Sequence, residues 1–167
     1  MGREIRRFSV IVMILLISTA ALASVGKESL KGLKGVMVDV EEIESNMEKD
    51  GLKRNSIQTD VKKKLRKAGI KVLSKKEKQK TPGMPWLYVS ISSGKISPGL
   101  YAYTMRLELI QSVALVRNTK ILCNASTWKS SEKIGAVDET NVKSLRYSLL
   151  DLVDEFIFDY LFVNSKE

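Results

Sequence analysis

The chain has 167 residues, of which 44% are hydrophobic and 28% are charged, so it can form one hydrophobic core preceded by a short terminal segment. This composition is typical of a folded globular protein and excludes bulk disorder. The net charge is +9, and the sequence contains no histidine. Catalysis by Ser-His-Asp or Cys-His arrangements and zinc sites with histidine ligands are therefore excluded.

The first 23 residues have the three parts of a secretory signal peptide: a basic head, an apolar run over residues 10–17 and an Ala-x-Ala motif. We expect cleavage after Ala23, a periplasmic or secreted protein, and no transmembrane span in the mature chain. A retained membrane anchor is the alternative, because residues 8–25 carry no charge, although a span normally needs about 20 residues. Ser24 stands where a lipoprotein signal would have a cysteine, so no lipid anchor is expected.

Residues 24–35 contain three glycines, which predict a flexible lead-in, and a single folded domain is expected over residues 36–167. Its first strand is indicated by the alternating apolar residues of Val36 to Val40. The following segment, residues 39–50, is rich in Asp and Glu. Its spacing does not fit an EF-hand loop, so a solvated loop or an acidic contact surface is expected.

A helix is predicted from Asn55, as its cap, to Ala68, and Gly69 ends it. Ile70–Leu73 then predicts a short strand that lies parallel to the first one through a right-handed crossover. Residues 74–85 are polar and contain two prolines, which indicates a mobile connection. The apolar stripe of the helix consists of Ile57, Val61, Leu65 and Ala68.

A long hairpin is predicted in the middle of the chain, after a strand over residues 86–92. Its first arm, residues 101–116, alternates apolar and polar side chains, and residues 120–129 form the return arm. Because typical strands have about 5 or 6 residues, we expect a bend or bulge near Ile110. Cys123 is the only cysteine, so no internal disulfide can form, and alternation predicts that it is a small buried hydrophobic residue.

Residues 128–137 predict a loop, and Asp138 or Asn141 begins the last helix, whose apolar residues recur at three- and four-residue steps up to Val163. Near its end the apolar surface is widened by Phe158, Leu161 and Phe162. Two explanations are open: these side chains pack in the core, or they contact something outside the domain. The predicted fold class is α+β, with a mixed, mainly antiparallel sheet of about five strands and two helices on one of its faces.

Positive charge is concentrated between Lys53 and Lys80, where twelve Lys or Arg residues face only two carboxylates. On the predicted helix these residues occupy the positions that the apolar stripe leaves free. The resulting basic face could bind an anionic envelope lipid, an anionic polymer or an acidic envelope protein. The candidate residues for binding an anion or a partner are Lys62, Lys63, Lys64, Arg66, Lys67 and Lys71.

A lysine-rich face that only solvates a surface helix is the alternative, because planar phosphate recognition prefers arginine. Nucleic acid is disfavoured as a partner, since no RNA-binding or zinc-finger pattern is present. Trp86 and Tyr88 form a candidate aromatic patch, for which packing within the sheet is the competing explanation.

The predicted order is strand, helix, strand, strand, long strand, strand and long helix behind an export signal. This order resembles small bacterial envelope accessory proteins, among them the lipopolysaccharide-assembly lipoprotein, the activators of penicillin-binding proteins and the N-terminal domain of the curli secretion lipoprotein. The resemblance is carried by the Val36–Val40 strand, the helix end at residues 68–72, the Leu87-Val89-Ile91 strand and the closing helix. It does not extend to the lipid-bearing cysteine, so membrane tethering does not follow from it.

The resemblance implies a non-enzymatic binding or assembly factor of the envelope that acts through the basic helix and loop. No catalytic residue, metal ligand or cofactor site is predicted. Two other interpretations stay open at this level. One is a carboxylate-dependent hydrolase of envelope glycans, which needs two acids facing one cleft. The other is a structural domain whose acidic segment and basic helix pair between copies.

Overall fold

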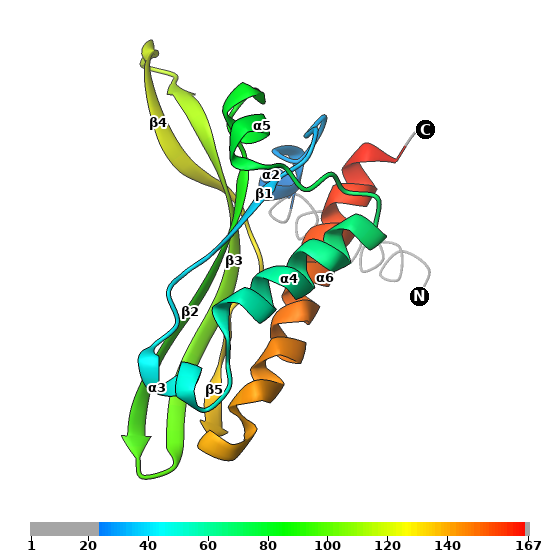
Figure 1. The fold of residues 1–167 in the computed structure, drawn as a ribbon. Coiled ribbons are helices and arrows are strands. Elements are labelled where there is room, and N and C mark those ends of the chain that lie inside the picture. The colour runs from blue at the N-terminus through cyan, green and yellow to red at the C-terminus, as the bar shows by residue number, and fades with distance from the viewer. Residues whose placement is uncertain (1–23, 166–167) are drawn as a thin grey trace, which may run out of the picture.

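The computed structural model describes residues 24–165, with side chains from Gly26 onward, and the predicted signal peptide lies outside this range. Helices and strands alternate irregularly along the chain, as in an α+β fold (Figure 1). In chain order the elements are α2 (Ser24–Glu28), β1 (Met37–Val40), α3 (Ser45–Lys49), α4 (Arg54–Lys67), α5 (Lys75–Lys80), β2 (Trp86–Ser97), β3 (Leu100–Leu115), β4 (Asn118–Lys129), β5 (Lys133–Asp138), the 3₁₀ helix η1 (Glu139–Ser144) and α6 (Leu145–Asn164).

β3 is the central strand of a five-stranded sheet. β2 pairs with it along one edge in antiparallel fashion. The other edge of β3 is shared, because β4 pairs with residues 108–115 and β5 with residues 100–105, both antiparallel. β1 extends the sheet beyond β2 and runs parallel to it. The prediction of a mixed, mainly antiparallel sheet is therefore confirmed.

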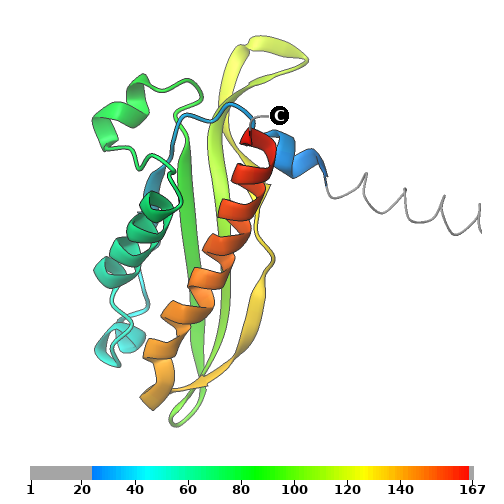
Figure 2. The ribbon, with the colours of Figure 1, turned by 90° about the vertical axis from the view of Figure 1, so that its right-hand side faces the viewer.

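α4 and α6 lie on the same face of this sheet and pack against each other (Figures 1 and 2). α4 contacts β1, and α6 contacts β3. Between the helices and the sheet lies the core, in which Phe156 of α6 meets Trp128 edge-on with ring centroids 5.1 Å apart. Core residues of the two helices include Ile57, Val61, Leu65, Leu149, Leu152 and Phe156. The predicted layer of two helices on one face is confirmed.

β3 and β4 form the long hairpin that alternation predicts, with one irregularity in its middle. Leu109 pairs with Trp128 but Ile110 pairs with Ser126, so Thr127 is the extra residue of a bulge on β4. Gln111 donates a hydrogen bond from Nε2 to Thr127 Oγ1 over 2.7 Å and holds the bulge in place. The expected irregularity near Ile110 is thus confirmed, although the extra residue belongs to the partner strand.

Beyond the bulge the hairpin projects past α4 and α6 (Figure 1). Side chains on both of its faces are exposed there, including Ile121 and Leu122. Cys123 is exposed as well, so the prediction that it is buried is wrong. Alternation assigned Cys123 to a face, but the helices do not reach far enough to cover that face.

Two predicted loops contain regular structure. Residues 133–138, expected to be part of a loop, form β5, which fills the edge of β3 that β4 leaves open. Within residues 74–85, expected to be a mobile connection, α5 forms behind a capping box in which Ser74 and Glu77 bond each other's backbone N–H groups. α3 likewise interrupts the acidic segment and buries Met47.

The N-terminal segment belongs to the folded domain. Leu30 and Leu33, in the stretch expected to be a flexible lead-in, are both buried in the core. The stretch expected as the second strand makes a single parallel bridge, Val36 to Val72. Gly35 sits beside this bridge with φ +144°, and a Cβ atom there would lie 2.5 Å from the Lys71 carbonyl oxygen, so only glycine fits.

Candidate functional site: the basic face of helix α4

α4 orients the predicted basic residues. Its apolar side chains Ile57, Val61 and Leu65 are buried and fix which side of the helix faces the sheet. Successive residues turn by about 100° around a helix axis, so the lysines between them are forced outward on two different flanks. The cap differs from the sequence prediction, because Lys53 rather than Asn55 occupies the N-cap position and makes no side-chain capping bond.

One flank of α4 borders α6, and an open depression of about 430 Å³ lies between the two helices. We call it the α4–α6 groove, and it is lined by Asp60, Lys63, Lys64, Lys67 and Leu150. Three of the predicted basic residues therefore meet at one place. Leu150 supplies an apolar wall from a helix more than eighty residues further along the chain.

Only part of the positive charge in the groove is free. Lys64 Nζ is 2.7 Å from an Asp154 carboxylate oxygen of α6. Asp60 accepts hydrogen bonds from the Arg146 guanidinium, including one of 2.9 Å from Nε. Among the residues that the structure describes, no carboxylate forms an ion pair with Lys63 or Lys67. These two ammonium groups are thus available to an external anion.

The other three predicted basic residues lie elsewhere. Lys62 and Arg66 are on the flank of α4 that faces away from α6, at helix positions about 100° before Lys63 and Lys67. Lys71 follows the helix and is 2.9 Å from Glu77 of α5. The Ser74 backbone N–H and Lys71 together lower the pKa of Glu77 to about 2. The structure therefore divides the six candidates into a groove set, an outer set and a structural ion pair.

The candidate aromatic patch lies on the opposite face of the sheet. Trp86 is half-buried beneath α5, with Lys78 Nζ 3.8 Å from its ring centroid. Tyr88 lies between β1 and β3, opposite Asp39 and Glu108. Burial and the negative charge of neighbouring carboxylates raise the pKa of the Tyr88 phenol. Both aromatics pack against their sheet neighbours, and the structure does not bring them to the α4–α6 groove.

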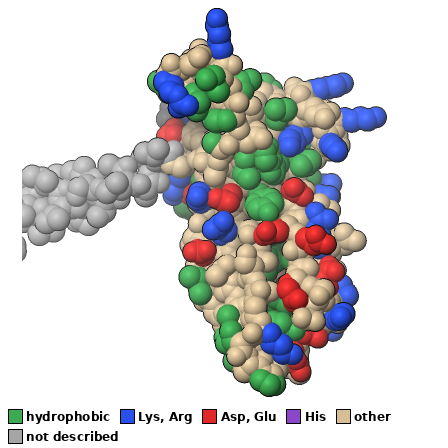
Figure 3. All heavy atoms as spheres, turned by 90° about the vertical axis from the view of Figure 1, so that its left-hand side faces the viewer, with side chains coloured by type: hydrophobic (Ala, Val, Ile, Leu, Met, Phe, Trp, Pro, Cys, Tyr) green, Lys and Arg blue, Asp and Glu red, His purple; other side chains and the backbone are tan. Residues whose placement is uncertain are grey.

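This sheet face also holds several carboxylates, among them Glu41 and Glu108. Figure 3 shows acidic and basic side chains mixed on it. Glu41 accepts a 2.6 Å hydrogen bond from Ser90, and Glu108 is 3.1 Å from Lys129. Each of these two acids therefore has a local partner on the sheet. Within residues 24–165, no group of Cys, Asp and Glu side chains is arranged to hold a metal ion.

Sequence reasoning missed what α6 contributes to the groove, namely Leu150 in its lining and the partners Asp154 and Arg146 of Lys64 and Asp60. Periodicity places these residues away from the core stripe, but nothing local indicates that they face α4. Comparison of the chain with protein-family models, curated proteins and solved structures finds no match. Across the described part of the chain, none of the helices combines the length and the apolar character that crossing a membrane requires.

Proposed function

We propose that this protein is an exported, non-enzymatic binding or assembly factor of the bacterial envelope that binds anionic groups through the α4–α6 groove. The observation that carries the proposal is the pair of unpaired ammonium groups of Lys63 and Lys67 at an open depression. The signal-like N-terminal sequence supports export. The absence of histidine and of recognised catalytic motifs supports a binding role.

The spacing of the two lysines suits a phosphate or carboxylate group. Residues four apart on a helix have their Cβ atoms about 5–6 Å from each other, so two flexible ammonium groups can converge on one anion. Lysine acts as a mobile point charge without fixed geometry, which fits repeated anionic groups on a polymer or lipid better than one shaped ligand. Leu150 adds a small apolar contact at the same place.

Two further features support a surface role. Lys62 and Arg66 add positive charge on the outer flank of the same helix, so an extended anionic partner could contact both flanks. The ion pairs Lys64–Asp154 and Asp60–Arg146 join α4 to α6 and hold the groove open in one shape. Exposed charges are screened over about 10 Å at 0.1 M salt, so binding should weaken as salt rises.

The experiment compares retention of the protein on a lipopolysaccharide-coated surface over a salt series. We expect the double substitution Lys63→Glu and Lys67→Glu to lower retention at low salt by about tenfold or more, since two attractive charges become repulsive. The matched control is Arg117→Glu with Lys120→Glu, which makes the same charge change on the exposed hairpin tip.

Equal losses in both double variants would show that only net charge matters, and would contradict a site in the groove. Unchanged retention of the groove variant would return α4 to the status of a solvated helix. If the protein is not retained at any salt but an acidic envelope protein co-purifies with wild type and not with the groove variant, the partner is that protein.

A further inference from the structure

A second surface lies at the C-terminal end of α6, beside α2. Three large apolar side chains are exposed there and are not part of the hydrophobic core. The exposed fractions are 64% for Phe158, 46% for Leu161 and 67% for Phe162. Large apolar side chains that gather on a monomer surface commonly mark an interaction site. We call this surface, together with Lys27 and Lys31, the aromatic–lysine patch.

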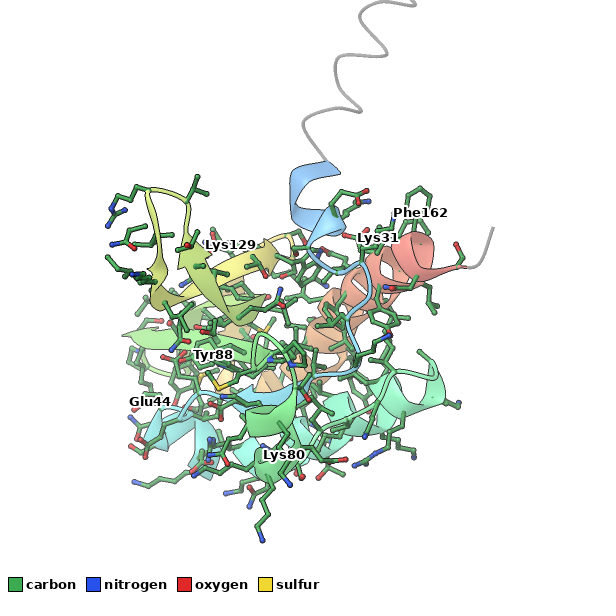
Figure 4. The ribbon with its side chains drawn as sticks, turned by 90° about the horizontal axis from the view of Figure 1, so that it is seen from above. Lys31, Glu44, Lys80, Tyr88, Lys129 and Phe162 are labelled. Atoms are coloured by element: carbon green, nitrogen blue, oxygen red, sulfur yellow. The ribbon has the colours of Figure 1, made fainter. Side chains whose placement is uncertain are left out.

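The patch is an ordered arrangement. The rings of Phe158 and Phe162 stack with centroids 6.3 Å apart and an interplanar angle of 21°. Lys27 Nζ lies 5.6 Å from the first ring centroid and 5.9 Å from the second. A depression of about 490 Å³ separates Phe162 from Lys31, and Figure 4 shows these two residues beside each other at the base of α2.

The patch is fixed to the N-terminal segment by hydrogen bonds. Asn164 accepts one of 2.8 Å from the Gly32 N–H and donates one of 2.9 Å to the Leu30 carbonyl. Tyr160 donates another of 3.0 Å to the Leu33 carbonyl. These hydrogen bonds hold the end of α6 against the segment that follows α2.

The position of the patch along the chain indicates its occupant. α2 begins at Ser24, in the last two residues of the uncharged stretch 8–25. Its five residues span only about 8 Å. If residues 8–25 act as an export signal or anchor, they lie in the bilayer while the chain is exported. As long as these residues remain attached, the patch lies close to the membrane because it is beside α2.

Carboxylates and lysines occur together around the patch, and Glu28 lines the same depression as Lys31 and Phe162. The carboxylates on the outer side of α6 are all engaged: Asp151 with Lys133, Asp154 with Lys64, Glu155 with Ser131 and Asp159 with Lys27. The adjacent Lys31 forms no ion pair within the described range. The charges of Lys27 and Lys31 are therefore balanced by Asp159 and Glu28, and a patch with little net charge suits a bilayer whose headgroups carry no net charge.

We infer that the aromatic–lysine patch docks on a phospholipid bilayer. Phe158, Leu161 and Phe162 enter the interfacial layer, where aromatic side chains are favoured, while the stem of Lys31 lies along the apolar surface and its ammonium group reaches the lipid headgroups. This surface is separate from the α4–α6 groove. It would hold the domain at the membrane while the groove binds an anionic partner.

The test uses the chain from Ser24 to Glu167, because the whole described core lies between Leu30 and Phe156 and is kept. The probe is a vesicle of phosphatidylcholine, whose headgroups have no net charge, so that charge attraction to the groove does not contribute. We expect retention on these vesicles at high lipid concentration that does not fade with salt. The double substitution Phe158→Ser with Phe162→Ser should lower it by about tenfold or more.

The matched control is Tyr147→Ser with Ile134→Ser, which removes two other side chains that are 75% and 73% exposed. It should stay within about twofold of wild type, because surface changes away from a site have small effects. The groove variant Lys63→Glu with Lys67→Glu should also keep its retention on phosphatidylcholine. The membrane test can therefore succeed even if the α4–α6 groove binds no anion.

Absence of retention by wild type, or an equal loss in the control, would overturn the inference. Sedimentation of the same variants measures their oligomeric state and so tests whether a second copy of the chain covers the patch. If wild type is a dimer that dissociates when Phe158 and Phe162 are replaced, the patch is a contact between copies and not a membrane surface. Thermal unfolding of each variant confirms that the fold is intact.

Discussion

The two helices that cover the sheet differ in what they leave on the outside. α4 buries its apolar residues almost completely and exposes lysines, of which Lys63 and Lys67 have no described carboxylate partner. α6 does the reverse, because its outer carboxylates are engaged by neighbouring elements while Phe158 and Phe162 stay exposed. On α4 the apolar side chains are buried but some charges have no partner. On α6 the outer carboxylates have partners but some aromatic side chains are not buried.

This difference separates structural from functional residues. A charge that has a partner on another element contributes to the fold, and an apolar side chain in the core does the same. What remains unsatisfied on each helix is free to bind something else. On α4 this is positive charge, and on α6 it is aromatic surface, so the two proposed sites differ in chemistry and in salt dependence.

The largest expected effect concerns two phenylalanines of α6 that are two residues apart. Phe156 is 0% exposed and contacts Trp128, so Phe156→Ala should lower the free energy of unfolding by about 3–5 kcal/mol. Phe158→Ala should change it by only about 0.5 kcal/mol. Urea unfolding of both variants measures the contrast, and a similar loss in both would show that the patch is part of the core.

The ion pair between the helices should have an intermediate effect. Asp60→Asn weakens its bonds to Arg146, and we expect a stability loss of about 1 kcal/mol. The same change removes a negative charge from the groove, so retention on lipopolysaccharide at low salt should rise by about twofold. Asp138→Asn, on exposed β5, is the charge-matched control and should change neither property. A fall in retention by Asp60→Asn would indicate that Asp60 itself contacts the ligand.

The smallest effect is a dependence on pH at the outer side of α6. The hydrogen bond and charge of Lys133 lower the pKa of Asp151 below its usual range. Because the folded-state pKa is the lower one, the ion pair stabilises the protein above the unfolded-state pKa of about 3.9. This stabilisation is lost as the pH falls through the folded-state pKa.

Asp151→Asn should therefore cost about 0.5 kcal/mol or less at neutral pH, since the pair is solvent-exposed, and nothing at strongly acidic pH. Chemical unfolding of wild type and variant over an acid series gives this difference directly. A difference that grows as the pH falls would have the wrong sign and would contradict a stabilising ion pair.

The long elements were predictable from the sequence because their patterns are local. Alternation over sixteen residues is enough to define β3, and apolar residues at three- and four-residue steps define α4 and α6. The bulge near Ile110 was expected because this arm is much longer than a typical strand. The direction of each buried face follows from these patterns, since burying the apolar side is the dominant gain.

The short elements were not predictable in the same way. β5 has only six residues and depends on the edge of β3 that β4 leaves free. α5 forms through the capping box of Ser74 and Glu77, a signal that is present in the sequence but was not used to predict a helix there. The exposure of Cys123 depends on how far α4 and α6 extend along the hairpin, which no local pattern contains.

The sequence by itself determined the α+β class, the central hairpin, the covering helices and the concentration of positive charge on α4. Only the tertiary structure decided which of those charges are free. Lys64 is neutralised by Asp154, ninety residues away, whereas Lys63 and Lys67 meet no such partner in the described chain. Periodicity is a local property, but charge compensation depends on distances between elements, and these are set when the core packs.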